Sequence, residues 1–312
     1  ASDVYKRQMK HLLKLLDLST EEITDILNLA DQLKYEQKHG IPHNILKGQT
    51  LGMIFQKSST RTRVSFETGM YQLGGQALFL SSRDLQIGRG EPVQDTARVL
   101  SRYLSGIMIR TFAQKEVEDL AEYGSIPIIN GLTDYCHPCQ VLADLQTVRE
   151  HKNKLDGLKF CYIGDGNNMA NSLTVGALKV GMSVSLGCPE GYFPDQTIID
   201  FAKQYPGKFQ IISNPVEAAA DADVVYTDVW ASMGQEGEAA KRREVFKGYQ
   251  INDAVMASAK PDAMVMHCLP AHREEEITAK VFEQHADEIF DEAENRLHAQ
   301  KAVMVRLMAP EA

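Results

Sequence analysis

Hydroxyl groups and a guanidinium follow one apolar run of this sequence in a pattern that suits phosphate binding. The run Leu51–Phe55 predicts a buried strand, and Val64–Leu73 predicts a helix that ends at Gly74. Between them lies Ser58–Arg63, with the sequence SSTRTR. A helix N-terminus offers free N–H groups, and an arginine can hold two phosphate oxygens at once. The segment predicts an anion site centred on Arg61, although an N-cap with solvated arginines fits the same residues.

Four further polar segments stand at comparable places and strengthen this prediction. Each contains groups that could bind a phosphate, a carbonyl or an amine. The segments are His137–Gln140 (HPCQ), Asp228–Gly234 (DVWASMG), His267–Pro270 (HCLP) and Glu294–Arg296 (ENR). Because each follows an apolar run that predicts a strand, we expect all five to meet at the carboxyl ends of parallel strands, where α/β proteins bind ligands.

A glycine-rich turn after Lys159–Ile163 admits a different interpretation. Its sequence, GDGNN at residues 164–168, resembles the dinucleotide fingerprint, but Met169 stands where the third glycine is required. No acidic residue follows at a strand end about 20 positions later. A nicotinamide-dependent dehydrogenase is therefore the alternative from another class of enzyme. Asn167 and Asn168 could instead present amides to a polar ligand.

Composition narrows the class of protein. The chain has 312 residues, 44% of them hydrophobic, which is enough for about two domains. Its net charge of −9 argues against a nucleic-acid surface, and no apolar run approaches the ~20 residues of a membrane span. Five cysteines without a framework of spacings favour a reduced, cytoplasmic protein. Cys136–Cys139 imitates a redox or zinc pair, but no second ligand pair follows, so we expect no metal.

Strands and helices alternate along the chain, which predicts an α/β fold with two doubly wound parallel-sheet domains joined by interdomain helices. The predicted strands are Leu51–Phe55, Gln76–Leu80, Gly106–Arg110, Pro127–Asn130, Lys159–Ile163, Ser183–Gly187, Gln210–Ser213, Val224–Asp228, Met264–His267 and Ile289–Phe290. Residues 1–8 are interpreted as a non-native leader. We expect a first domain at 9–137, a linking helix at 138–150 and a second domain at 151–294. A last helix at 295–312 would return to the first domain, and 237–243 predicts a mobile loop.

Taken together, the segments resemble the aspartate/ornithine carbamoyltransferase family over essentially the whole chain from Met9 onward. SSTRTR followed by HPCQ is similar to the carbamoyl phosphate half of that family. Asp228 with Ser232–Gly234, followed by HCLP, resembles its ornithine branch. The resemblance implies transfer of the carbamoyl group from carbamoyl phosphate to the δ-amine of L-ornithine, which gives L-citrulline and phosphate in arginine metabolism. It implies no cofactor.

The resemblance also implies roles for individual residues. Carbamoyl phosphate would be bound by Ser59, Thr60, Arg61, Thr62, Gln86, Arg110, His137, Gln140, Cys268, Leu269 and Arg296. L-Ornithine would be bound by Asn168, Asp228, Ser232 and Met233. Arg110 and His137 would act in catalysis by polarising the carbonyl oxygen, while Asp228 and Cys268 would lie near the attacking amine. Gln86 would reach the site of a neighbouring subunit in a homotrimer or a higher multiple of it.

Two alternatives stay open beside this interpretation and the dehydrogenase. One is a carbamoyltransferase for another amine, such as putrescine or an acylated ornithine, although the polar groups of Asp228 and Ser232–Gly234 favour a free α-amino acid. The other is a catalytically dead binding homologue. Against it argues the joint presence of Arg61, Arg110, His137, Gln140, Cys268 and Arg296.

Overall fold

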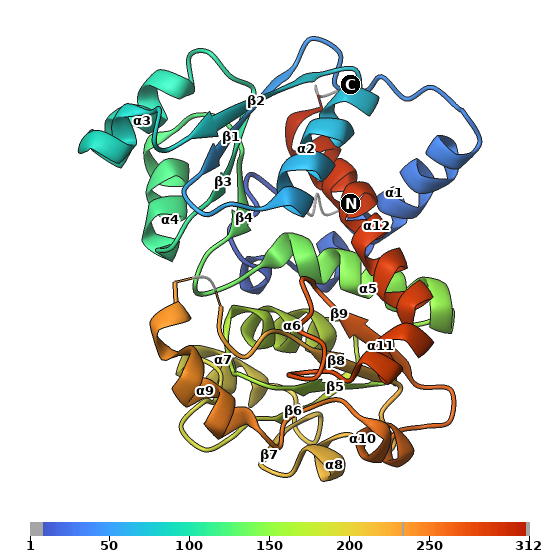
Figure 1. The fold of residues 1–312 in the computed structure, drawn as a ribbon. Coiled ribbons are helices and arrows are strands. Elements are labelled where there is room, and N and C mark those ends of the chain that lie inside the picture. Colours follow the sequence, from blue (N-terminus) through green and yellow to red (C-terminus); the bar gives the residue numbers. More distant parts are fainter. Residues whose placement is uncertain (1–8, 233, 310–312) are drawn as a thin grey trace.

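The protein is built around two separate parallel β-sheets. The computed structural model describes residues 9–232 and 234–309. One sheet has four strands in the order β2-β1-β3-β4, and the other has five in the order β7-β6-β5-β8-β9. Neighbouring strands are parallel in both sheets, and Figure 1 shows one sheet above the other with helices packed around them. The predicted α/β fold with two parallel sheets is confirmed.

Nine strands and twelve α-helices form the described part of the chain. The strands are β1 Thr50–Phe55, β2 Gln76–Ser81, β3 Gly106–Arg110, β4 Ile128–Leu132, β5 Lys159–Ile163, β6 Ser183–Gly187, β7 Phe209–Ile212, β8 Val224–Thr227 and β9 Met264–His267. The helices are α1 Thr20–Lys38, α2 Thr60–Gln72, α3 Val93–Leu100, α4 Gln114–Tyr123, α5 Pro138–Lys152, α6 Asn168–Lys179, α7 Gln196–Ala202, α8 Pro215–Ala218, α9 Ala239–Phe246, α10 Asp253–Ser258, α11 Ala279–Gln284 and α12 Ala286–Met308. Short 3₁₀ helices lie at η1 Leu15–Asp17, η2 Gln86–Arg89 and η3 Glu236–Glu238. Within residues 9–232 and 234–309, no helix combines the length and the apolar character that a membrane crossing demands.

The tenth predicted strand, Ile289–Phe290, is wrong because both residues lie inside α12. Ile289 is fully buried and Phe290 is 55% exposed. Burial recurs at Ile289, Glu292 and Arg296, which is the spacing of one helix face. The last helix therefore starts at Ala286 rather than at residue 295. The ENR segment lies within this helix and not behind a strand.

Helix α2 begins four residues earlier than the predicted Val64. Ser59 is its N-cap, and the Ser59 side chain accepts a hydrogen bond from the backbone N–H of Thr62 at 3.2 Å. Because β1 ends at Phe55, Arg61 enters the first helical turn directly beyond the carboxyl end of that strand. The predicted relation between Arg61 and a helix N-terminus therefore holds.

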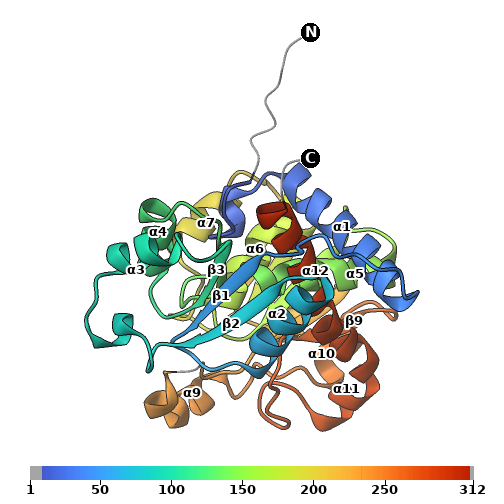
Figure 2. The same cartoon turned by 90° about the horizontal axis from the view of Figure 1, so that it is seen from above.

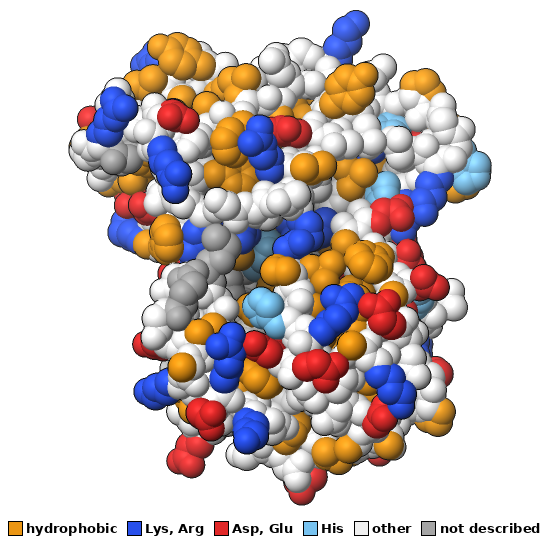
Figure 3. All heavy atoms as spheres, viewed as in Figure 1, with side chains coloured by type: hydrophobic (Ala, Val, Ile, Leu, Met, Phe, Trp, Pro, Cys, Tyr) orange, Lys and Arg blue, Asp and Glu red, His pale blue; other side chains and the backbone are white. Residues whose placement is uncertain are grey.

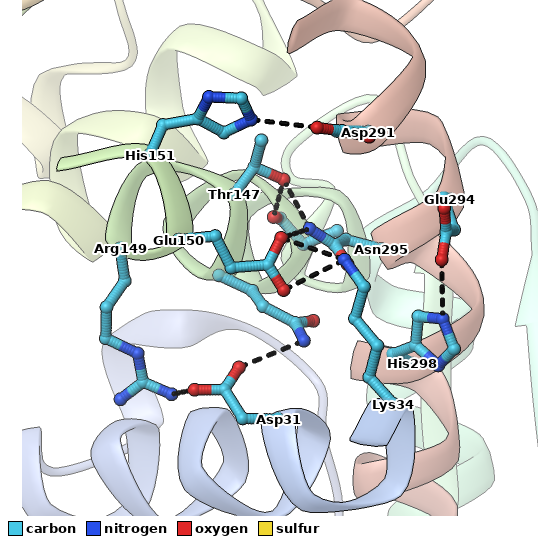
Figure 4. A network of polar contacts seen from close by, with 12 residues as sticks. Asp31, Lys34, Thr147, Arg149, Glu150, His151, Asp291, Glu294, Asn295 and His298 are labelled. Carbon is cyan, nitrogen blue, oxygen red and sulfur yellow. Dashed lines mark hydrogen bonds and ion pairs between the residues drawn. The ribbon is translucent and has the colours of Figure 1, made fainter. Parts of the chain in front are cut away.

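Helix α12 links the two halves, since it packs against α1, α2 and α5. Figures 1 and 2 show it running between these helices. Figure 4 shows the polar network that ties three of them together. Lys34 of α1 donates to Glu150 of α5 at 2.9 Å and to Asn295 of α12 at 2.8 Å. The Asn295 amide donates in turn to Thr147 and Glu150, at 2.9 Å each.

The mobile loop predicted at Gly237–Arg243 is wrong, because this stretch forms η3 and the start of α9. Arg242 is only 5% exposed. Its guanidinium forms an ion pair with Asp165 and donates a hydrogen bond to the carbonyl of Trp230. A buried guanidinium with two acceptors fixes α9 against the carboxyl edge of the second sheet. The charged residues of this stretch thus include a buried anchor.

Candidate active site

A pocket with a volume of about 320 Å³ opens between the two sheets. Its walls come from the segments that follow β1, β3, β4, β5, β8 and β9, and from α12. Figure 3 shows the cleft between the two halves, with Lys and Arg side chains along it. The carboxyl ends of both parallel sheets therefore face one shared site, as the rule for α/β proteins predicts.

Most of the predicted site residues line this pocket. They are Ser59, Arg61, Thr62, Arg110, His137, Gln140, Asn168, Asp228, Ser232, Cys268, Leu269 and Arg296. Thr60 lies in the first turn of α2 but is not one of the lining residues. Gln86 is exposed in η2 and does not line the pocket of its own chain. Met233 lies outside the described residues.

Three guanidinium groups converge on one end of the pocket. Arg61 comes from α2, Arg110 from the end of β3 and Arg296 from the middle of α12. The strand register pairs Arg110 with Phe55, the last residue of β1, and so sets it near the start of α2. Burial, and then the charges of the other two arginines, lowers the pKa of Arg110 to about 9. Like charges held this close favour an anion between them.

Arg296 and Arg61 are oriented by uncharged acceptors. The Arg296 guanidinium donates to the Gln140 side-chain oxygen at 2.7 Å, to the Thr62 hydroxyl at 3.0 Å and to the Gln300 oxygen at 2.9 Å. Arg61 donates to the backbone carbonyl of Leu269 at 2.8 Å. Such acceptors hold each guanidinium in place without neutralising its charge, so the charge stays available to a ligand.

His137 lies beside the three arginines as the N-cap residue of α5. Burial, and then the charges of these arginines, holds the pKa of His137 well below its ordinary value. The imidazole is therefore neutral near pH 7. Its buried Nδ1 has no hydrogen-bond partner among residues 9–232 and 234–309. A neutral imidazole can donate one N–H to a carbonyl oxygen without adding positive charge.

The pocket also contains a carboxylate and a thiol, those of Asp228 and Cys268. Asp228 accepts hydrogen bonds from the Cys268 thiol at 3.1 Å, from the Asn167 amide at 2.9 Å and from the Val229 backbone N–H at 2.8 Å. Burial raises the pKa of Cys268 well above its ordinary value, and the charge of Asp228 raises it further. The thiol therefore stays protonated and donates to the carboxylate. An anionic oxygen beside a neutral polar group suits a substrate amine.

The glycine-rich turn is built for packing rather than for a dinucleotide. A Cβ on Gly166 would lie 2.2 Å from the backbone carbon of Phe193 and 2.3 Å from the nitrogen of Pro194. Gly166 is thus required by the close approach of two backbone segments. Asn167 caps α6, and its side-chain oxygen accepts from the N–H groups of Met169 and Ala170. Because a protein side chain fills the helix N-terminus, the dehydrogenase alternative loses its main support.

Several lining residues escaped the sequence analysis. Lys57 is 5% exposed, forms an ion pair with Asp134, and places its Nζ 4.4 Å from the ring centre of Phe112. Phe112 and Asp134 follow β3 and β4, so their place beyond strand ends was an available signal. Neither belongs to a recognisable motif, and Lys57 stands just before the segment that was singled out.

One cleft between the two α/β halves thus contains a group of anion-binding arginines and a carboxylate–thiol pair. This combination is typical of a transferase that moves a group from an anionic donor to an amine. Comparison with known proteins narrows this class. Residues 10–150 match the family described as aspartate/ornithine carbamoyltransferase, carbamoyl-P binding domain. Residues 156–307 match the Asp/Orn binding domain of the same family. The chain belongs to the aspartate/ornithine carbamoyltransferase family.

The chain is similar over nearly its full length to proteins named ornithine carbamoyltransferase. It is 54% identical over 303 residues to that of Thermococcus kodakarensis, with 96% of each chain covered. The identity is 57% over 304 residues with that of Oceanobacillus iheyensis, covering 96% of this chain and 94% of the relative. The solved structure of the Pyrococcus furiosus enzyme superposes with a TM-score of 0.92 at 52% identity, covering 97% and 98% of the two chains. The anabolic enzyme of Campylobacter jejuni gives 0.90 at 43% identity, covering 96% and 99%.

Proposed function

We propose that this protein is an ornithine carbamoyltransferase, which transfers the carbamoyl group of carbamoyl phosphate to the δ-amine of L-ornithine and releases L-citrulline and phosphate. One observation carries the proposal. A single pocket is lined by three arginines and by the Asp228–Cys268 pair. The full-length similarity to ornithine carbamoyltransferases supports the same substrates.

Carbamoyl phosphate would lie at the arginine end. Its phosphate would be bound by the first turn of α2, from Ser59 to Thr62, and by the Arg296 guanidinium. Arg110 and the neutral His137 would donate hydrogen bonds to the carbonyl oxygen. These donors are fixed in place before the reaction, so they stabilise the negative charge that develops on that oxygen in the transition state. Gln140 and the carbonyls of Cys268 and Leu269 would accept from the carbamoyl NH₂.

Ornithine would enter from the carboxylate–thiol end. Asn168, Ser232 and Met233 would bind its α-carboxylate and α-ammonium, and Asp228 would lie near the δ-amine. The neutral δ-amine forms a bond to the carbonyl carbon, and the carbon–oxygen bond to phosphate then breaks. The proton that the amine releases leaves on the phosphate. Cys268, held as a thiol by burial, would position the amine and need not act as a nucleophile.

A substrate comparison tests the proposal. Product formation from carbamoyl phosphate should be measured with L-ornithine, putrescine, N-acetylornithine and L-aspartate as acceptors. We expect L-citrulline from ornithine and little product from the other three. Putrescine and N-acetylornithine lack the free α-amino acid group that the polar loop groups would bind, and L-aspartate lacks a side-chain amine. Faster reaction with putrescine or N-acetylornithine would reassign the acceptor. Absence of any carbamoyl transfer by a folded protein that binds carbamoyl phosphate would favour the dead homologue.

We further propose that the active site is shared between subunits of a homotrimer. Gln86 is exposed and lies outside the pocket of its own chain. Large apolar side chains are exposed nearby on α2 and β2, where Tyr71 is 82%, Val64 54% and Phe79 39% exposed. A second copy that covered this face could bring its Gln86 loop to the bound carbamoyl phosphate. The five free cysteines support a cytoplasmic location for the enzyme.

A further inference from the structure

Two carboxylic acids are buried directly behind Gln140. Asp144 lies one turn beyond Gln140 on α5, and Glu292 lies one turn before Arg296 on α12. Both acids are 0% exposed. The Gln140 amide nitrogen donates to Asp144 at 2.8 Å and to Glu292 at 3.0 Å. Neither acid lines the pocket, and the mechanism above uses neither of them directly.

The hydrogen-bond donors are divided unequally between the two acids. Glu292 accepts from the Gln140 amide and the Tyr226 hydroxyl at 3.1 Å on one oxygen, and from the His267 backbone N–H at 2.8 Å on the other. Asp144 accepts from Gln140 on Oδ1 alone. Within residues 9–232 and 234–309, no hydrogen-bond donor contacts its buried Oδ2. Three donors suit an ionised carboxylate, whereas an oxygen without a donor suits a protonated acid.

A single negative charge on the pair also agrees with its surroundings. Burial, and then the charge of Glu292, raises the pKa of Asp144 well above its ordinary value. Burial raises the pKa of Glu292 as well, while the hydrogen bonds from Asp144, His267 and Tyr226 oppose that shift. Two adjacent buried carboxyl groups cannot both ionise cheaply, so they share one proton. The two side chains lie within hydrogen-bonding reach of each other, so a protonated Asp144 can donate to Glu292.

This arrangement fixes which side of the Gln140 amide faces the pocket. Both amide hydrogens point to the acids, and the amide oxygen accepts from Arg296 at 2.7 Å. Rotating the amide by half a turn would set its oxygen against two acid oxygens and its N–H groups against the guanidinium. Both contacts would be repulsive. Gln140 is therefore held with its oxygen on the Arg296 side, where both residues line the pocket.

We propose that Asp144 and Glu292, with one shared proton on Asp144, are positioning residues that lock Gln140 as a hydrogen-bond acceptor and thereby select an acyl phosphate that carries an N–H donor. The inference rests on the proposed function, in which that donor is the carbamoyl NH₂. Acetyl phosphate has the same phosphate and carbonyl but carries a methyl group in place of NH₂. The acid pair therefore governs discrimination between these two ligands and not the affinity for phosphate itself.

The experiment measures dissociation constants of carbamoyl phosphate, acetyl phosphate and inorganic phosphate by calorimetry, without ornithine. Discrimination is the ratio of the dissociation constant of acetyl phosphate to that of carbamoyl phosphate. In Asp144→Asn the new amide can accept from Gln140 and donate to Glu292, as the protonated acid does. This ratio should therefore stay within about threefold of the parent value. In Glu292→Gln no orientation of the new amide can accept from all three donors, and discrimination should fall further. In the double variant both neighbours of Gln140 are amides that accept either orientation, so discrimination should fall about tenfold. Affinity for inorganic phosphate should change little in all three.

Tyr226→Phe is the matched control, because it removes one donor to Glu292 without touching Gln140, and it should keep the discrimination. Difference infrared spectra should show the carbonyl band of a protonated carboxylic acid in the parent, and this band should disappear in Asp144→Asn. The inference is overturned if the folded double variant still discriminates like the parent. It is also overturned if Asp144→Asn loses more discrimination than Glu292→Gln. A parent that binds and discriminates these ligands yet forms no citrulline would instead contradict the proposed function.

Discussion

Arg61, Arg110 and Arg296 give the pocket its chemical character, and two of them, Arg61 and Arg296, are held by uncharged acceptors. Arg61 donates to a backbone carbonyl and Arg296 to uncharged side chains. His137, which shares their space, stays neutral because burial and the three cations keep its pKa low. The site thus places positive charge around the phosphate of the substrate. It also provides an uncharged hydrogen-bond donor for the carbonyl oxygen.

The first prediction concerns Arg61→Ala. This variant should fold but lose carbamoyl transfer almost completely, since removing a charge-assisted phosphate contact costs roughly 3 kcal/mol. The measurement is kcat/KM for carbamoyl phosphate, with circular dichroism to show that the fold is kept. Arg306→Ala is the control, because Arg306 is 44% exposed and its ion pair with Asp25 spans 3.5 Å. A kcat/KM close to the parent value in Arg61→Ala would contradict the placement of the phosphate beside Arg61.

The second prediction concerns pH. The pKa of His137 is held well below its ordinary value and that of Cys268 well above it, so neither side chain titrates across the neutral range. The charged δ-amine has no lone pair to attack with, and the rate should rise ~tenfold per pH unit until the bound amine has lost its proton. The rising limb in kcat should persist in Cys268→Ser, although kcat/KM for ornithine falls. Loss of the limb in that variant, or a competent carbamoyl-thioester on Cys268, would contradict this assignment.

Sequence patterns identify the pocket residues that belong to motifs. They do not identify the buried acids that contact and orient one of those residues, Gln140. SSTRTR and HPCQ stand out because polar groups follow apolar strands. Asp144 and Glu292 give no such signal, since each lies within a helix that carries other acids and only the tertiary contact places it behind Gln140. The partner of a buried acid depends on which helices pack together, and that cannot be inferred from the spacing along one helix.

At the scale of elements, strands were more predictable than the last helix. Each strand of the two sheets is a short apolar run, and nine of them match predicted positions. Half of the residues that helix α12 buries are polar, including Glu292, Arg296, Gln300 and Lys301. A hydrophobic pattern does not reveal a buried face of this kind, so the two apolar residues Ile289–Phe290 by themselves predict a strand. The loop prediction at Gly237–Arg243 is wrong for a similar reason. Its charged residues predict a solvent-exposed segment, but Arg242 is buried.

The third prediction tests the network in Figure 4, which joins α1, α5 and α12. Lys34→Met should lower the free energy of unfolding by about 1–3 kcal/mol, because Glu150 and Asn295 lose their shared donor in a partly buried place. Lys34 and Glu150 side chains are only 13% and 27% exposed. The control is Lys38→Met, one turn along α1. The side chains of Lys38 and of its ion-pair partner Glu294 are 55% and 37% exposed, so this ion pair should contribute at most about 1 kcal/mol. Urea unfolding measures both, and equal losses would show that the network adds nothing.

At the scale of the whole molecule, the two sheets supply the two ends of one reaction site. The arginine end is built from the four-stranded sheet and α12, while Asp228 and Cys268 follow strands of the five-stranded sheet. Helices α5 and α12 connect these halves. The domain boundaries inferred from the sequence stay a prediction. The exposed apolar residues of α2 and β2 are one part of the surface that a single chain leaves unexplained, and a shared active site would account for them.

The fourth prediction tests that assembly by complementation. Gln86→Ala and Arg110→Ala should each be strongly impaired alone. Suppose that each site combines Arg110 of one chain with Gln86 of its neighbour. When an equal mixture of the two variants is unfolded and reassembled, about a quarter of all active sites should then be intact. Mixing Arg110→Ala with Arg296→Ala is the matched control, because both defects lie on the same side of the site and no intact site can form. Restored activity in the first mixture alone would support the shared site. If sizing shows mixed oligomers and both mixtures stay as inactive as their parents, Gln86 is an ordinary exposed loop residue and each chain forms its site alone.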